Sequence, residues 1–114
     1  TLPSTLNLAK FKVDGKVVKK DDRYVVQDNT ALKNLILSST DLNPKKETSG
    51  HNHSGQEEVY IFTSGEGSMI VGIELNDVKM GDIVLIPDGD FHKVWNEGDE
   101  DLIFICVFDG GRNH

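Results

Sequence analysis

Two histidines and a glutamate lie close together in this sequence and suggest metal chemistry. His51 and His53 are two residues apart, and Glu58 follows His53 after four intervening residues. Side chains two apart in a β-strand point to the same face, so both imidazoles are expected on one side. Glu58 begins a β-branched and aromatic run, EVYIF, which predicts the next strand. Imidazole and carboxylate groups bind divalent first-row metals, so the pattern predicts a metal site, although it also occurs on solvated hairpins.

The composition excludes several classes of partner. The 114 residues suffice for one domain, and 37% hydrophobic with 27% charged residues is ordinary for a globular protein. The net charge of −7 argues against binding to nucleic acid or to an anionic membrane surface. No apolar run approaches the roughly 18–20 residues of a membrane span. We therefore expect a small-molecule ligand, with no nucleic-acid or membrane partner.

Cysteine usage and the first residues bear on location. Cys106 is the single cysteine, so the sequence can form no intrachain disulfide. No signal-peptide pattern opens the sequence. Both observations predict a cytoplasmic protein.

Short apolar segments separated by turn signals predict an all-β fold. The dipeptide Asp14-Gly15 predicts a type I′ hairpin between residues 11–13 and 16–18, and Gly72-Ile73 predicts a type II′ hairpin. The charged run 19–22 reads as a solvated turn. Many short strands with turn signals every 8–12 residues or so are typical of a sandwich or barrel. The expected strands cover residues 23–27, 32–38, 58–62, 68–71, 74–75, 83–86, 91–95 and 102–108.

A second motif follows and gives the chain a family resemblance. Residues 81–96 read GDIVLIPDGDFHKVWN, which matches every fixed position of the second cupin motif, G-x5-P-x-G-x2-H-x3-N. The earlier stretch resembles the first cupin motif, G-x5-H-x-H-x3,4-E-x6-G, with Gly65 closing it. Glu57 also meets the permitted spacing, but it would place Ser64 at the closing glycine, so Glu58 is the assigned acid. The one departure is Lys45, which stands where the first motif opens with glycine.

The resemblance covers roughly residues 30–108 and implies both a fold and a metal site. The fold is an antiparallel double-stranded β-helix, or jelly-roll β-barrel, formed by residues 31–114. Residues 1–30 are expected to add an N-terminal arm with a hairpin to the same domain. The implied ligands are His51, His53, Glu58 and His92. They would hold one divalent metal, and the residue types do not choose among Mn, Fe, Co, Ni and Zn.

Strand alternation predicts which side chains share the interior with these ligands. Counting from Glu58, Tyr60 and Phe62 should face inward, and counting from His92, Val94 should do so. Tyr60 is a candidate catalytic residue because its phenol can transfer a proton. Phe62 is a candidate substrate contact. The alternative for both rings is ordinary core packing.

Apolar residues on the outward positions predict an interface. Val59, Ile61 and Trp95 should face outward, and residues 102–108 are apolar on both faces. A homodimer that packs two such sheet faces together would explain this pattern. The alternative is coverage of the face by residues 1–30.

Three functions remain open, because one fold hosts many chemistries. The preferred hypothesis is a metal-dependent enzyme that acts on a small oxygenated metabolite as a dioxygenase, decarboxylase, lyase or isomerase. The alternatives are a non-catalytic module that binds a sugar or another metabolite, and a metal that only clamps the barrel. Arginines are few, and no lysine is expected in the interior, which argues against phosphorylated sugars.

Overall fold

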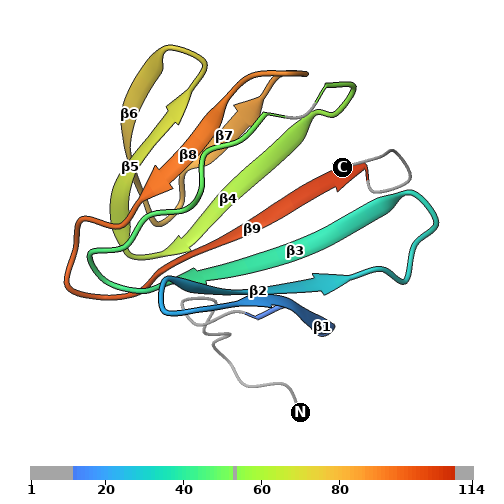
Figure 1. Cartoon of the computed structure of the whole chain (residues 1–114), viewed down its shortest axis with the longest axis horizontal. Coiled ribbons are helices and arrows are strands. Elements are labelled where there is room, and N and C mark those ends of the chain that lie inside the picture. The colour runs from blue at the N-terminus through green and yellow to red at the C-terminus, as the bar shows by residue number, and fades with distance from the viewer. Residues whose placement is uncertain (1–11, 53, 110–114) are drawn as a thin grey trace.

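The computed structural model describes residues 12–52 and 54–109, and these residues form β-strands without any helix. None of them therefore belongs to a helix that could cross a membrane. The strands are β1 (Lys16–Lys20), β2 (Tyr24–Asn29), β3 (Leu35–Leu42), β4 (Glu58–Ser64), β5 (Glu66–Val71), β6 (Glu74–Lys79), β7 (Ile83–Ile86), β8 (His92–Trp95) and β9 (Leu102–Asp109) (Figure 1).

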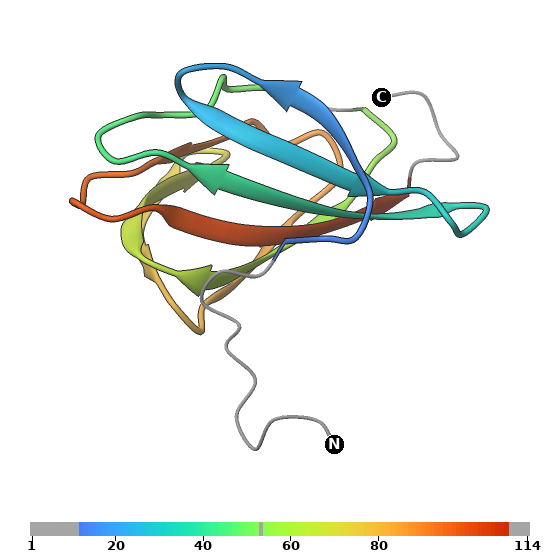
Figure 2. The ribbon, with the colours of Figure 1, turned by 90° about the horizontal axis from the view of Figure 1, so that it is seen from below.

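The strands form two antiparallel sheets. The larger sheet has six strands in the order β1-β2-β3-β9-β4-β7, and the smaller has three in the order β6-β5-β8. The smaller sheet lies at the upper left of Figure 1, and Figure 2 shows the twist of the larger one. The predicted all-β, double-stranded β-helix fold is confirmed.

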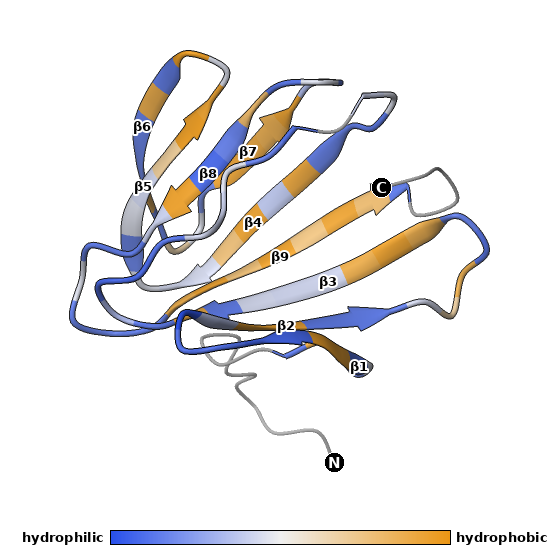
Figure 3. Ribbon diagram, in the orientation of Figure 1, coloured by the Kyte–Doolittle hydropathy of each residue, from blue (hydrophilic) through white to orange (hydrophobic). Residues whose placement is uncertain are grey.

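The most apolar strand lies in the middle of the larger sheet. β9 pairs with β3 along its whole length, from Leu42↔Leu102 to Leu35↔Asp109, and with β4 on its other side. Figure 3 shows hydrophobic residues along β9 and on the neighbouring parts of β3 and β4. The predicted alternation is confirmed, because Tyr60, Phe62 and Val94 are buried, whereas the positions expected to face outward, Val59, Ile61, Lys93 and Trp95, are only partly buried.

Most predicted strands lie near their expected positions, but the strand predicted at 32–38 is displaced. It runs instead from Leu35 to Leu42 as β3. The strand continues past the predicted end at residue 38, and its polar residues Ser38, Ser39 and Thr40 are all buried. The Ser39 hydroxyl accepts a hydrogen bond from the Val13 amide at 3.0 Å, which shows how a buried serine is satisfied within the strand.

The predicted hairpin at Asp14-Gly15 is wrong. Of the residues before it, Lys12 and Val13 are described, and they lie outside any strand. The hairpin forms instead at residues 21–23, between β1 and β2, which overlaps the charged turn predicted at 19–22. A Cβ on Gly15 would overlap the carbonyl oxygen of Asp28, so this glycine permits a close approach to β2. The hairpin predicted at Gly72-Ile73 is confirmed, since Gly72 has φ 61° between β5 and β6.

The departure from the first motif coincides with an unusual backbone conformation. Lys45 has φ 63°, a left-handed conformation that no other described residue except glycine adopts. Its ammonium donates to the carbonyl oxygen of Glu97 at 2.8 Å and lies 3.4 Å from Asp99. Lys45 thus occupies a glycine conformation with its side chain anchored to the loop after β8.

Candidate metal centre and cavity

The centre of the candidate site joins the two sheets. Glu58 begins β4 in the larger sheet, and His92 begins β8 in the smaller one. Their side chains meet, with Glu58 Oε2 2.8 Å from His92 Nε2. Both are buried, with exposed side-chain fractions of 7% and 2%. A charged carboxylate at such a place requires a cation or a proton beside it.

Turns from both motifs place these two side chains. Pro87 ends β7, and the turn through Gly89, with φ 81°, redirects the chain into the other sheet. The Asp88 carboxylate accepts a hydrogen bond from the Gly55 amide at 2.6 Å, which ties the two motif loops together. The buried Gln56 amide donates to the Asp109 carbonyl at 2.9 Å and so fixes the start of β4 against the end of β9.

His51 completes the cluster from a third segment. It forms an isolated bridge with His92, and its amide donates to the His92 carbonyl at 3.2 Å while the His92 amide donates back at 2.9 Å. The two rings are 4.4 Å apart in an edge-to-face arrangement. Single ligand atoms of His51, Glu58 and His92 all lie within 4.8 Å of one another. His51 is exposed, and His53, the fourth predicted ligand, lies outside the described residues.

The donor set fits a metal ion. His92 Nδ1 lies 3.1 Å from the Asp90 carbonyl oxygen, to which it can donate only if it carries the hydrogen. His92 Nε2 then presents a lone pair toward the Glu58 carboxylate, an arrangement in which histidine commonly binds metals. Two metal–ligand bonds of about 2.1 Å at right angles place their donor atoms about 3.0 Å apart. The 2.8 Å separation of Nε2 and Oε2 is therefore suited to a shared cation.

The same contacts set the protonation of His92. Burial lowers the pKa of His92, but the hydrogen bond to Glu58 and the Asp90 carbonyl outweigh it, so the pKa is raised above its ordinary value. The imidazole and carboxylate can thus also hold a proton between them, which is the competitor that a metal would displace.

A cavity of about 440 Å³ opens beside the cluster, and His51 and Glu58 lie in its wall. The remainder of the wall combines hydroxyl groups, aromatic rings and two further charged side chains. The hydroxyl groups come from Ser38, Thr40, Thr48 and Ser49, and the charged pair is Lys19 and Asp28. Such a mixture of apolar wall and convergent polar groups is typical of a small-molecule site.

Tyr60 lies in this wall, and Phe62 does not. Burial, the neighbouring Cys106 and Glu58 raise the pKa of Tyr60 well above its ordinary value, so the phenol stays neutral. Its ring is 5.8 Å from that of His92 and stacks on Phe104 at 5.0 Å. Phe62 is 1% exposed and packs at 5.2 Å from Phe104 in the core. The catalytic role of Tyr60 and the substrate contact of Phe62 remain predictions, and the cavity supports only the first.

Sequence reasoning missed two charged residues of the cavity. No lysine was assigned to the interior, and Lys19 is indeed exposed, but it lines the cavity wall beside Tyr24 and Val26. Asp28 lines it as well, in register with Ser38 on the adjacent strand. Alternation along β2 places Tyr24, Val26 and Asp28 on one face, so Asp28 could have been found once β2 was known to border the interior.

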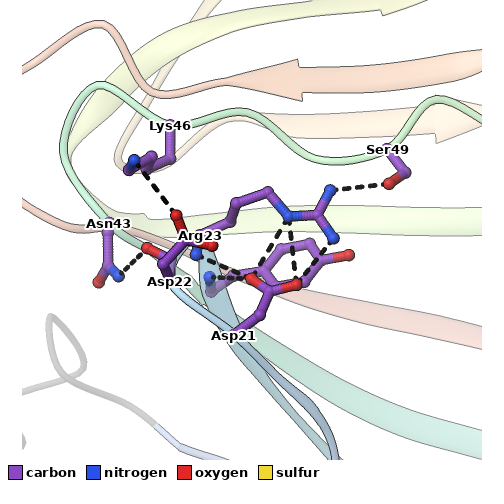
Figure 4. Close-up of polar contacts among 7 residues, drawn as sticks. Asp21, Asp22, Arg23, Asn43, Lys46 and Ser49 are labelled. Carbon is purple, nitrogen blue, oxygen red and sulfur yellow. Dashed lines mark hydrogen bonds and ion pairs between the residues drawn. The ribbon is translucent and has the colours of Figure 1, made fainter.

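Arg23 braces the segment that carries His51. Its guanidinium lies 2.8 Å from Asp21 and donates to the Ser49 hydroxyl at 2.8 Å (Figure 4). The Asp22 backbone carbonyl accepts a hydrogen bond from the Asn43 side-chain amide at 2.9 Å, and the Asp22 carboxylate lies 3.5 Å from the Lys46 ammonium. The β1–β2 turn is thereby tied to the segment 43–49, two residues before His51. Hydrogen bonds with Arg23 lower the pKa of Asp21 to about 2.

Comparisons with known proteins agree with the motifs. The profile of the family described as Cupin domain matches residues 39–108, which confirms the resemblance. The chain is 27% identical over 117 residues to glucose-6-phosphate isomerase of Pyrococcus abyssi, covering 87% of this chain and 62% of that protein. It is 29% identical over 72 residues to the oxalate-binding protein of Thermotoga maritima, covering 63% of this chain and 60% of that protein.

A solved structure is similar over most of the chain. A conserved protein with a double-stranded β-helix domain from Klebsiella pneumoniae superposes with a TM-score of 0.76 at 22% identity, covering 86% of each chain. At that identity the likeness concerns the fold. The chain spans about three fifths of the length of the two named relatives, 62% and 60%.

Proposed function

We propose that this chain, which belongs to the cupin family, is a metal-dependent enzyme that acts on a small oxygenated metabolite. The observation that carries the proposal is the 2.8 Å approach of His92 Nε2 to Glu58 Oε2, with a ligand atom of His51 within 4.8 Å, beside a cavity of about 440 Å³. A cation that bridges these groups would lie next to whatever molecule enters the cavity.

His51, Glu58 and His92 would hold the metal, with His53 as the fourth ligand. The bound metal would supply a Lewis acid for oxygen atoms of the substrate, or a partner for O₂ if it is redox-active. The Asp90 carbonyl orients His92, and the Arg23 brace positions the segment before His51. Tyr60 would offer a neutral phenol that donates a hydrogen bond. Metal identity is left among Mn, Fe, Co, Ni and Zn.

The names of the relatives support an oxygen-rich substrate. One relative is an isomerase of a sugar phosphate, and another binds oxalate. The two ligands differ in size and chemistry, but both present negatively charged oxygen atoms. We extend to this chain only that shared feature, together with the reaction classes of dioxygenase, decarboxylase, lyase and isomerase.

Metal content tests the proposal. Untagged protein should carry about one first-row metal per chain by plasma mass spectrometry, and Glu58→Gln should lose most of it. Glu57→Gln is the matched control, because Glu57 is the exposed neighbour with the other permitted motif spacing. Wild-type protein that stays empty after metal soaking refutes the site, and metal loss only in Glu57→Gln refutes the assignment of the acid. Loaded protein is then screened for O₂ consumption and for isomerisation.

A non-catalytic binding module is the second candidate. The raised pKa of Tyr60 favours it, since an efficient acid or base has a pKa near the working pH. Binding of small acids or sugars without any product detectable by NMR would support the module over the enzyme.

We also propose a homodimer formed through the outer face of the larger sheet. Val59 pairs with both Leu85 and Val107, and Ile61 pairs with Ile83 and Ile105, so apolar residues form continuous rows across β7, β4 and β9. Ile83 and Leu85 are 63% and 69% exposed. Exposed apolar rows of this kind mark interaction surfaces. Light scattering should give twice the chain mass, and Leu85→Lys should halve it. A wild-type mass of one chain refutes the dimer.

Two further expectations keep the status of proposals. We assign the N-terminal segment 1–30 to the same domain as the barrel, because its strands β1 and β2 extend the larger sheet beyond β3; residues 1–11 of the expected arm lie outside the described residues. We place the protein in the cytoplasm, where its buried free Cys106 would stay reduced.

A further inference from the structure

An irregularity in β1 determines what faces the cavity. Val17 pairs with Gln27 and Lys19 pairs with Val26, so Val18 is an extra residue in β1 without a partner of its own. Val26 faces the cavity, and directly paired residues share a face, which places Lys19 on the cavity side. Strict alternation from Val17 would have turned Lys19 outward. Bulges of this kind often re-aim a side chain beside a functional site.

The Lys19 side chain lies over an aromatic ring of the cavity wall. Its ammonium lies 5.3 Å from the centre of the Tyr24 ring, and Tyr24 is buried in the same wall. No other lysine or arginine is among the described residues of the cavity wall. The nearby Arg23 is engaged with Asp21 and Ser49, so its charge is already matched. Lys19 is therefore the cation available to a molecule in the cavity.

Asp28 supplies an acceptor on the same two-stranded ribbon. Its Oδ1 is buried and has no hydrogen-bond partner within the described part of the chain. The charge of Asp28 contributes to raising the pKa of Cys106, after burial and Glu58. Ser38 pairs with both residues, so the carboxylate acts on a thiol two strands away in the same sheet, within the cavity wall. A buried acceptor without a hydrogen-bond partner destabilises the folded chain, and a hydrogen bond from a ligand hydroxyl would remove that cost.

We propose that Lys19 and Asp28 form a ligand subsite for an anionic sugar, a sugar phosphate or a sugar acid, with Lys19 binding the anion and Asp28 a hydroxyl. The inference rests on the proposed function, because it concerns the cavity beside the candidate metal ligands. A charged end at Lys19 leaves the other end of the molecule free to reach His51 and Glu58. The volume of about 440 Å³ is suited to a molecule of six or so carbons, within the usual range of small-ligand sites.

Binding measured by calorimetry on the full, metal-loaded chain tests the subsite. The probes are glucose 6-phosphate, gluconate and neutral glucose, so that phosphate and carboxylate are distinguished from a bare sugar. We expect binding of at least one anionic probe and no comparable binding of glucose. Lys19→Gln should lower the affinity for the anionic probe roughly tenfold or more, as expected for the loss of a charge-assisted hydrogen bond. Lys19→Arg should retain most of the affinity, and Asp28→Asn should weaken both anionic probes.

Lys20→Gln is the matched control, because Lys20 pairs with Val25 and faces away from the cavity. Equal affinity of Lys19→Gln and wild type refutes the subsite, as does equal binding of glucose and the anions. Failure of wild type to bind either anion while its metal content is normal also refutes the subsite and leaves the proposed metal site standing. Anion binding that depends on Lys19 in a chain that never holds metal supports the subsite and refutes the proposed metal-dependent enzyme. Circular dichroism confirms that each variant is folded, and Lys19→Arg separates loss of charge from loss of fold.

Discussion

Replacing Lys45 by glycine should relieve a cost that this chain carries and its family motif avoids. The left-handed conformation of Lys45, with φ 63°, costs a residue other than glycine about 1–2 kcal/mol. Lys45→Gly removes that cost but gives the unfolded chain about 0.4–1 kcal/mol of additional conformational entropy. It also removes the hydrogen bond from the Lys45 ammonium to the Glu97 carbonyl and the ion pair with Asp99. The Lys45 side chain is 64% exposed, and Asp99 is almost fully exposed. Exposed contacts of this kind contribute about 0–1 kcal/mol.

Lys45→Ala separates these contributions, since it loses the same contacts and keeps the unfavourable backbone. Lys45→Gly should therefore be more stable than Lys45→Ala by about 1 kcal/mol, while remaining within about 1 kcal/mol of wild type. Lys45→Asn should fall between them, because asparagine tolerates the left-handed conformation.

Urea unfolding followed by the fluorescence of Trp95, the single tryptophan, measures the differences. EDTA is included because a metal that binds the folded chain would raise its apparent stability. Equal stability of Lys45→Gly and Lys45→Ala, with unchanged slopes against urea, refutes the reasoning about the backbone. It would mean that the strain at residue 45 is absent or is released in the alanine variant.

Three other substitutions test the framework around the site. Burial, and then Asp101, raise the pKa of Asp41 from its ordinary 3.8 to about 6. The folded chain therefore binds this proton more tightly than the unfolded chain, and the free energy of unfolding should fall as the pH rises from about 3.8 to about 6. Asp41→Asn should abolish that fall and stabilise the chain at pH 7 by up to about 1 kcal/mol after solvent screening; an unchanged pH profile, with exposed Asp99→Asn as control, contradicts it. The buried Asn96 side chain donates to the carbonyl oxygens of Leu42 and Glu100 and accepts from the Gly98 amide. Asn96→Ala should lower the free energy of unfolding in urea by about 2–3 kcal/mol, whereas Asn76→Ala, at an exposed position, should change it little. Gly65 and Gly81 both have positive φ, but a Cβ on Gly65 would also lie 2.5 Å from the Asp101 carbonyl oxygen, so thermal melts should show Gly65→Ala more destabilised than Gly81→Ala; the reverse order would exclude the clash.

Local patterns predicted the parts of the fold that depend on neighbouring residues. The strand at residues 83–86 and the turn at Gly72 follow from β-branched residues and a glycine, and both are where they were expected. The alternation that buries Tyr60 and Phe62 follows from the pleat of one strand. The departure at Lys45 was visible as a missing glycine, but its left-handed backbone was not.

The parts that depend on pairing between distant strands could not be read from the sequence. The bulge at Val18 exists only relative to β2, so alternation within β1 gave no reason to place Lys19 inside. The continuation of β3 through Ser39 and Thr40 was missed, because these polar residues are buried only through contacts with distant parts of the chain. Ser39 accepts a hydrogen bond from Val13, and Thr40 lines the cavity. Among the candidate ligands, the contact of Glu58 with His92 joins two sheets, so its distance had to come from the structure.

The central position of β9 governs when this domain can fold during synthesis. β9 is the ninth described strand in sequence, yet it separates β3 from β4 in the larger sheet. Until it leaves the ribosome, β3 and β4 each present an open edge with unpaired backbone groups, and sheet edges of that kind readily pair with other chains. Closure then requires contacts between residues as far apart as Leu35 and Asp109, which makes folding slow compared with that of helical proteins of this size. The nascent chain therefore passes through an aggregation-prone interval that ends only when β9 inserts, and cellular chaperones would act on it during that interval.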